Sequence, residues 1–260
     1  MSGIHTGVSV EGWDWAHPAG LSSTMDEILV DLARCEKLEP LPPAPPFTGA
    51  QLAVLGITGI EFAAFRTRHP RGLGTDLVAL GAPDGATSPG RIYRVDGECH
   101  FAQVDICRPL PFADACVDWV YAEHLIEHVS LREGIGWLTE VRRILAPGGL
   151  LRLTTPDLRR YVESYLRDDG LFGKHRRRLS AAGVGPPMPA RGAFMFNQMF
   201  YLWGHRWIYD LDELRHALDS AGFDPDAVRL CAFRQGARPD VADLDQVLRN
   251  DETIYVEVTR

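Results

Sequence analysis

Residues 104–158 read VDICRPLPFADACVDWVYAEHLIEHVSLREGIGWLTEVRRILAPGGLLRLTTPDL and carry the clearest structural pattern in the chain. One apolar run ends at Asp105, and a second run, 117–122, leads directly into EHLIEH. A helical segment follows over 131–146, and Pro-Gly-Gly then precedes a third apolar run at 150–155. Short apolar runs that alternate with helical segments predict the strands of a parallel α/β sheet.

The same alternation continues on both sides of this stretch. We expect seven strands, at 77–80, 91–96, 100–105, 117–122, 150–155, 228–233 and 253–258. A helix is expected over 210–223, because Asp210 is a typical N-cap and Gly222 a typical stop. The pattern predicts a doubly wound α/β fold with a mostly parallel sheet and an antiparallel C-terminal strand.

The N-terminal part, residues 1–75, does not follow this alternation. It contains an irregular arm, a segment with helical spacing at 22–38 and a proline-rich linker at 38–47. The segment 51–70 reads either as a strand, a glycine turn and a helix, or as one helix broken at Gly56. We therefore expect an N-terminal extension before a main domain at 76–260.

Bulk composition excludes several classes of protein. The net charge is −8, with 27 Lys and Arg against 35 Asp and Glu, so a general nucleic-acid surface is not expected. No apolar stretch reaches the ~20 residues that span a bilayer, and the N-terminus has no signal-peptide pattern, so we expect a cytoplasmic protein without membrane contact. Five scattered cysteines without C-x-x-C indicate reduced thiols. Lysine occurs only at 37 and 174, an arginine-rich composition that we associate with a bacterial genome.

Four short strings carry a resemblance to a known family: PLPF at 109–112, EHLIEH at 123–128, LAPGG at 145–149 and TPDL at 155–158. Together they resemble a small bacterial branch of the class I S-adenosylmethionine (SAM)-dependent methyltransferases. The resemblance implies a Rossmann-like fold, SAM as cofactor and methyl transfer to a small molecule, plausibly in bacterial biosynthesis of secondary metabolites.

Two glycine turns compete for the position after the first strand of such a fold. The stretch 52–59 has Gly-x-x-Gly, and 77–85 has Gly81 and Gly85. We favour the second, because Asp96 follows at the distance expected for an acid that accepts hydrogen bonds from the ribose. The resemblance then implies a set of cofactor-binding residues: Gly81, Ala82, Asp84, Gly85, Asp96, Gly97, Asp105, Ile106, Ala122 and Glu123. Pro83 departs from the family pattern and removes one backbone donor.

The string EHLIEH has two interpretations. If a helix begins at Glu123, then His124 and His128 are an i,i+4 pair that resembles a zinc-binding arrangement. The family resemblance explains the string without metal, so we expect no metal requirement. His124 is the first candidate for a general base and His205 the second, with Asp157 and Tyr201 as further candidate catalytic residues.

Residues 159–209 interrupt the alternation and are the expected substrate lid. Aromatic side chains with polar tips gather between Asn197 and Tyr209, as in small-molecule pockets. The partner is expected to be a small-molecule substrate, and the N-terminal extension is a candidate for contacts in a homodimer. Two alternatives remain: a non-methylating SAM reaction that releases methylthioadenosine, through aminopropyl transfer or cyclisation, and an inactive scaffold protein.

Overall fold

Five parallel strands form the centre of the sheet in a computed structural model that describes residues 32–185 and 188–260. In spatial order they are β7 (Cys99–Gln103), β3 (Gly72–Asp76), β2 (Gly59–Phe62), β8 (Val117–Glu123) and β9 (Leu145–Pro156). The chain runs from β2 to β3 on one side and later returns to β8 on the other. Strand order therefore reverses at β2, and open α/β sheets bind ligands outside the carboxyl ends of the strands at such a point.

Four further strands extend this centre to a nine-stranded sheet. On one side β11 (Thr253–Thr259) pairs antiparallel with β9, and β10 (Arg229–Cys231) pairs with β11. On the other side β6 (Ile92–Val95) pairs antiparallel with β7, and β1 (Leu38–Pro40) pairs with β6. A separate hairpin contains β4 (Gly81–Ala82) and β5 (Gly85–Ala86). The predicted fold class and the antiparallel C-terminal strand are confirmed, but the predicted number of strands is wrong, because the sheet has nine strands rather than seven.

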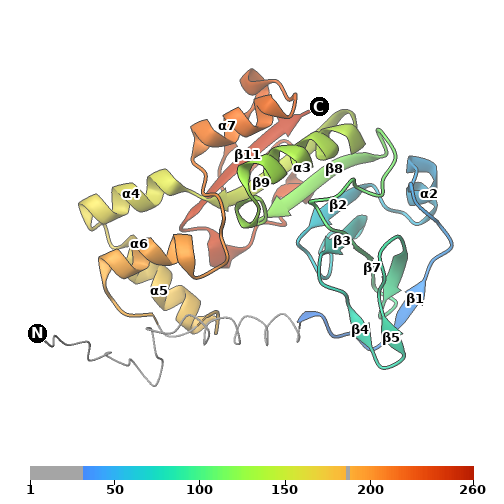
Figure 1. The fold of residues 1–260 in the computed structure, drawn as a ribbon, viewed down its shortest axis with the longest axis horizontal. Coiled ribbons are helices and arrows are strands. Elements are labelled where there is room, and N and C mark those ends of the chain that lie inside the picture. The colour runs from blue at the N-terminus through green and yellow to red at the C-terminus, as the bar shows by residue number, and fades with distance from the viewer. Residues whose placement is uncertain (1–31, 186–187) are drawn as a thin grey trace, which may run out of the picture. The chain divides into compact units, whose positions relative to one another are not determined.

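Helices cover one face of the sheet. The helices α3 (Leu131–Ile144) and α7 (Leu211–Ser220) contact each other and lie side by side in Figure 1, and α2 (Gly49–Val54) packs into the same core. The sequence sets where two of them begin: Ser130 and Glu133 form a capping box for α3, and the Asp210 carboxylate accepts from the Glu213 amide at the start of α7. Their apolar side chains, such as Trp137 and Leu138, are buried with those of the central strands.

On the opposite face of the sheet, a loop rather than a helix follows β2. Residues 63–71, which connect β2 to β3, form an irregular loop. The buried Glu61 holds this loop, since its carboxylate accepts from the amides of Arg68 and His69, each at 3.1 Å. The loop lies close to the sheet because β3 is glycine-rich: a Cβ added to Gly74 would meet the Ala64 carbonyl oxygen at 2.7 Å.

A long connection between β10 and β11, residues 232–252, completes this second layer. It contains α8 (Pro239–Ala242) and the 3-10 turn η3 (Val247–Arg249). Val241 and Leu244 pack on Trp119 and Tyr121, which lie on the opposite side of β8 from Val120 and Ala122. The two loops are joined by the Arg68 guanidinium, which donates to the Leu244 carbonyl, and by His69 Nε2, which lies 3.1 Å from Asp240.

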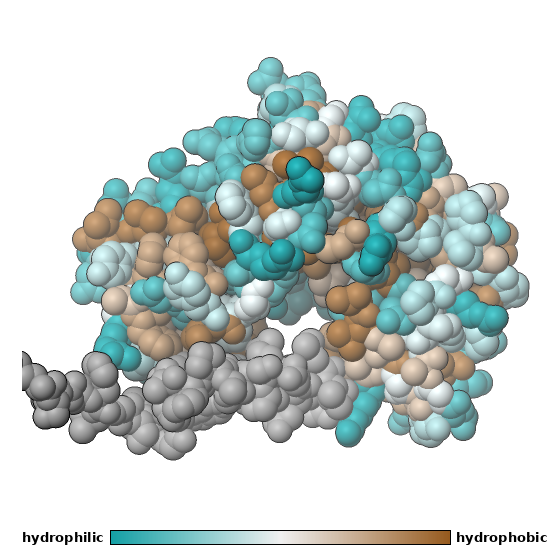
Figure 2. Space-filling view, viewed as in Figure 1, coloured by the Kyte–Doolittle hydropathy of each residue, from teal (hydrophilic) through white to brown (hydrophobic). Residues whose placement is uncertain are grey.

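Three helices belong to a second, smaller compact unit. The larger unit holds residues 33–157 and 206–260, and the described part of the smaller one is Leu32, 158–185 and 188–205. Its helices are α4 (Leu158–Arg167), α5 (Leu171–Ala181) and α6 (Gly192–Tyr201). Apolar residues are visible at the surface of α4 in Figure 2, where Leu166 is 77% exposed. No described helix is long and apolar enough to cross a bilayer.

Several predictions about the N-terminal half are wrong. The expected first strand at 77–80 is not a strand, and the expected strand at 91–96, now β6, is antiparallel. Neither interpretation of 51–70 is correct, because helix α2 precedes Gly56 and strand β2 follows it. The sheet therefore starts before the predicted boundary at residue 76, while most of the helix expected at 22–38 lies outside the described residues.

Candidate functional site

Two strained backbone positions flank the point where strand order reverses. Ala63 follows β2 with φ of 54°, and His124 follows the neighbouring strand β8 with φ of 52°. Residues other than glycine seldom adopt the left-handed region, and such strain gathers at functional sites. The two turns therefore mark the carboxyl edge of β2 and β8 as the candidate site.

Acidic side chains end the two strands on one side of this point. Asp76 ends β3, and Asp105 follows β7. Burial raises the pKa of the Asp76 carboxyl, and hydrogen bonds from the amides of Val78 and Leu77 offset part of this effect. Asp105 accepts from the Cys107 amide at 2.9 Å, which fixes its turn. Both carboxylates thus lie at the carboxyl edge, where a ligand hydroxyl or amine would find an acceptor.

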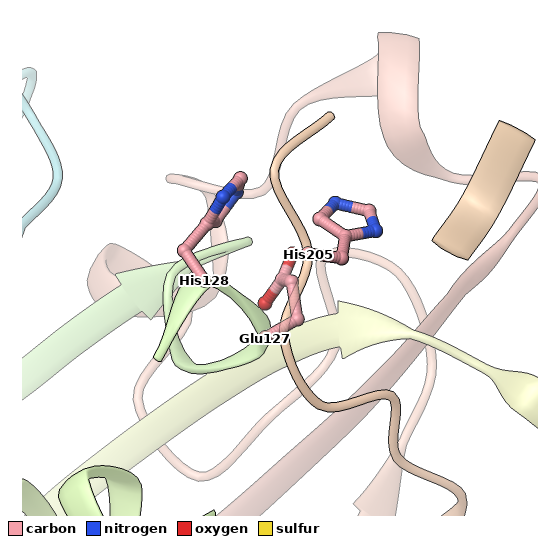
Figure 3. A group of neighbouring side chains, drawn as sticks. All are labelled: Glu127, His128 and His205. Carbon is pink, nitrogen blue, oxygen red and sulfur yellow. The ribbon is translucent and has the colours of Figure 1, made fainter. Parts of the chain in front are cut away.

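The end of β8 carries a buried polar cluster. Figure 3 shows Glu127 and His128 on the turn η1 (Ile126–His128) that follows β8. Glu127 Oε1 lies 3.4 Å from His124 Nδ1, and Glu127 Oε2 accepts from Thr155 Oγ1 at 2.9 Å. Complete burial is the main reason why the pKa of Glu127 rises to about 8. His124 Nε2 lies 2.7 Å from Thr253 Oγ1, so both ring nitrogens of His124 face protein groups.

Glu123, the last residue of β8, lies on the other face of the sheet. Its Oε1 accepts from the Gln246 amide at 2.9 Å. Its Oε2 is buried and has no hydrogen-bond partner within the part of the chain that the structure describes. Burial raises the pKa of this carboxyl, partly opposed by the Gln246 amide and by the charge of Arg249. Because η1 is a 3-10 turn and Glu123 belongs to a strand, the expected i,i+4 helix pairs do not form.

The predicted cofactor turn at Gly81–Gly85 does not follow a parallel strand. Its residues belong to the β4–β5 hairpin, in which Gly81 and Ala82 are partly buried and Asp84 and Gly85 are exposed. The Gly81 N–H donates to the Ala33 carbonyl, and its own carbonyl accepts from the Cys35 N–H. Both backbone groups of Gly81 are therefore already used within the protein.

Asp96 is also placed differently from the prediction. Asp96 and Gly97, with φ of 53° and 77°, form the turn of the β6–β7 hairpin, which lies at the amino end of β7. The Asp96 carboxylate pairs with Arg66 at 2.7 Å and accepts from the amides of Glu36 and Lys37. The Arg66 hydrogen bond lowers its pKa most. The premise that Asp96 ends the second parallel strand is wrong, and Asp76 holds that position.

The other predicted site residues are distributed as follows. Ala122 and Glu123 end β8, and Ile106 follows Asp105. Asp157 follows β9, and its amide donates to the Glu252 carbonyl at 2.8 Å. In the smaller unit, Tyr201 ends α6 and is 77% exposed, and His205 Nδ1 contacts the Met199 carbonyl. A cavity of about 320 Å³ lies at the opposite, amino edge of the sheet, beside Gly148 and Thr259, away from Ile106, Ala122 and Glu123.

The sequence prediction missed three elements of the site: Glu61, the Ala63 turn and Asp76. Asp76 had a usable signal, because it is an acid that directly follows the short run GLGT. The Ala63 turn had none, since its sequence AAFR contains no glycine.

Comparison with known proteins gives a family match within the larger unit. A family model described as a methyltransferase domain matches residues 58–153, which run from the start of β2 into β9. A comparison with curated proteins finds no match.

Among solved structures, a SAM-dependent methyltransferase from Mesorhizobium loti is 14% identical, with 82% of this chain and 98% of that chain covered and a TM-score of 0.43. A possible histamine N-methyltransferase from Thermotoga maritima is 14% identical, with 93% and 97% covered and a TM-score of 0.41. A Haloferax volcanii putative methyltransferase, solved in complex with the Trm112 activator, is 15% identical, with 93% and 96% covered and a TM-score of 0.40. The family match covers residues 58–153, and the reversal of strand order at β2 lies within this stretch, so this part of the chain resembles a methyltransferase domain.

Proposed function

We propose that the protein transfers the methyl group of SAM to a small-molecule acceptor. The observation that carries this proposal is the alignment of Asp76, Asp105 and Glu123 at the carboxyl ends of three parallel strands. In this proposal Asp76 accepts hydrogen bonds from the ribose hydroxyls, a role suited to a carboxylate with two acceptor oxygens. Asp105 accepts from the adenine amine, and the Ile106 N–H donates to a ring nitrogen.

These residues fit the nucleoside half of SAM. The Asp76 side chain is partly buried, and its partners named above are amides of its own turn, so a ribose would add the hydrogen bonds that a partly buried acceptor needs. The first turn fits less closely, because Ala63 and Ala64 stand where close backbone approach favours glycine. Asp76 thus replaces Asp96 as our proposed ribose acid.

The reaction needs orientation more than strong acid–base catalysis. Bound SAM supplies an electrophilic methyl group, and the protein holds an acceptor in line with it. The buried contacts of His124 favour a positioning role, in which it fixes the turn after β8. We keep His205, Tyr201 and Asp157 as proposed acceptor-side residues and the segment 159–209 as the proposed acceptor cover. Substitution of His205 or Tyr201 by alanine should lower turnover at least about tenfold.

Binding and product analysis test the proposal. Calorimetric titration with S-adenosylhomocysteine should give a micromolar-range affinity, roughly −7 to −8 kcal/mol. Mass spectrometry of reactions with SAM and candidate acceptors should then detect S-adenosylhomocysteine. No binding at millimolar concentration would contradict the cofactor role and favour a scaffold protein.

One observation supports a second candidate function. The Ala63–Ala64 turn departs from a glycine-rich turn, and a shifted cofactor would expose a different carbon to attack. Methylthioadenosine as the product would indicate this non-methylating reaction.

Metal analysis tests the expectation that no metal is required: stoichiometric zinc with activity lost on chelation would overturn it.

A further inference from the structure

Because no helix follows β2, the amino-acid end of SAM lacks the binding group that such a helix would supply. In a strand–helix–strand unit the N-terminus of the helix presents free N–H groups and a partial positive charge to an anionic ligand group. Here residues 63–71 form an irregular loop, so no helix N-terminus follows β2. The carboxylate at the amino-acid end of SAM must therefore find its positive charge elsewhere.

The connection between β10 and β11 brings other groups to the same edge. The Gln246 amide donates to Glu123, and Thr253 Oγ1 contacts His124 Nε2, so the segment 246–253 is attached to the end of β8 at two points. The sequence between these points contains η3 and its last residue, Arg249. This segment occupies the carboxyl edge beside β8 on the face that lacks the helix.

Arg249 is held in place by hydrogen bonds of its backbone, whereas its side chain makes none with the described residues. Its N–H donates to the Gln246 carbonyl, and its carbonyl accepts from Thr253 Oγ1 at 2.6 Å. The residue is partly buried, and its guanidinium has no hydrogen bond or ion pair with any residue in 32–185 or 188–260. Its charge nevertheless acts on two buried carboxyls, because after the effects of burial and of local hydrogen bonds it lowers the pKa of both Glu123 and Glu127.

Glu123 complements this arginine. One carboxylate oxygen is occupied by the Gln246 amide, while Oε2 has no partner among the described residues and is buried. A buried carboxylate oxygen without a donor is costly, and an ammonium group would satisfy it with a charge-assisted hydrogen bond. Within the described part of the chain, a positive group without an acceptor and a carboxylate oxygen without a donor therefore lie at one strand end.

We propose that Arg249 and Glu123 bind the zwitterionic amino-acid end of the cofactor, with its carboxylate on the Arg249 guanidinium and its ammonium on Glu123 Oε2. The pair thereby replaces the absent helix N-terminus. This inference rests on the proposed function, because it takes the nucleoside to lie over Asp76 and Asp105. An amino-acid acceptor offers the same zwitterionic chemistry, and the ligands chosen below separate the two sources.

Two ligands that differ in the amino-acid end provide the test. S-adenosylhomocysteine carries the zwitterion, whereas methylthioadenosine keeps the adenine, ribose and sulfur but lacks it. Calorimetry of the full chain should show that Arg249→Gln weakens S-adenosylhomocysteine at least about tenfold while methylthioadenosine changes by less than about twofold. Glu123→Gln should act in the same direction, because it keeps the acceptor for the Gln246 amide but loses the charge.

Controls make each outcome decisive. Arg229→Gln removes an exposed arginine on β10 and should change neither affinity. Thermal unfolding of each variant checks that the fold is intact.

If Arg249→Gln leaves S-adenosylhomocysteine binding unchanged, the cofactor is not held by Arg249 and the inference is wrong while the proposed function stands. Equal loss of both ligands would also overturn it, since the effect would not be specific to the zwitterion. If the unaltered protein binds neither ligand, the proposed function and this inference fail together.

Discussion

Glu127 Oε1 lies 3.4 Å from His124 Nδ1, and both side chains are buried directly after β8. Thr253 contacts the other ring nitrogen of His124, and Thr155 donates to the other oxygen of Glu127. These contacts hold His124 at its left-handed φ of 52°. The pair therefore shapes the turn at the candidate cofactor site and makes its geometry depend on a buried carboxyl.

The free energy of unfolding of Glu127→Gln, measured relative to that of the unaltered protein, should increase as pH rises. The pKa of the folded carboxyl, about 8, lies above its ordinary value of 4.5, so between these values the unfolded chain releases a proton that the folded chain retains. In this pH window the free energy of unfolding of the unaltered protein should fall by about 1.4 kcal/mol per pH unit relative to that of Glu127→Gln. The groups around Glu127 include His124, His128, Thr155, Tyr209, Arg249 and Glu252.

Urea unfolding at pH 5, 6.5 and 8 measures this difference. Glu133→Gln is the matched control, because Glu133 is a surface carboxyl whose pKa is lowered by hydrogen bonds from Ser130. Its difference from the unaltered protein should stay constant from pH 5 to 8. A Glu127→Gln difference that is flat across this range would show that Glu127 ionises normally.

Gly74→Ala should destabilise the fold by about 1–3 kcal/mol, the usual cost of inserting a group into a packed site. The added Cβ would meet the Ala64 carbonyl oxygen at 2.7 Å and push the 63–71 loop away from β3. Gly136→Ala is the control, because it lies in α3 with no atom within 4 Å of its added Cβ. It should stabilise by about 0.5–1 kcal/mol through helix propensity. Equal effects of the two substitutions in thermal unfolding would mean that the loop does not press on the sheet.

Asp245→Asn should cost about 3–5 kcal/mol of unfolding free energy, as expected when one partner of a buried ion pair is removed. Asp245, in the β10–β11 connection, accepts from Arg152 of β9 at 2.9 and 2.6 Å, and both side chains are fully buried. Asp114→Asn removes the exposed partner of Arg143 and should cost less than about 1 kcal/mol. A small effect at Asp245 would indicate that the connection is not anchored through this pair.

The sequence predicted the C-terminal half of the sheet because its signals are local. The β8–α3–β9 unit has apolar strands, a Ser130 capping box and a glycine turn, and the Asp210 cap begins α7 as expected. Asp105 was placed correctly at a strand end for the same reason. Each of these features depends on residues close together in sequence.

The N-terminal half was misread because a stronger local signal was overlooked. Asp96-Gly97 stands between two β-type runs, which is the typical signature of a tight hairpin rather than of a strand end that faces a ligand. The true first strand was hidden because no helix follows it, and because the loop that replaces the helix is held by contacts such as Glu61 with His69 and Arg68 with Leu244. The second of these joins residues far apart in sequence, so no local pattern reveals it.

Calorimetric titration of Asp76→Asn and Asp96→Asn with S-adenosylhomocysteine tests the central claim most directly. Asp76 ends the parallel strand beside β2, whereas Asp96 lies in the β6–β7 hairpin and pairs with Arg66. The account predicts that Asp76→Asn weakens binding by about 1.5–3 kcal/mol, the range for a hydrogen bond to a charged group, and that Asp96→Asn leaves it unchanged. The reverse result, with binding lost in Asp96→Asn and retained in Asp76→Asn, would contradict the placement of the cofactor at the carboxyl edge of β2, β3 and β8.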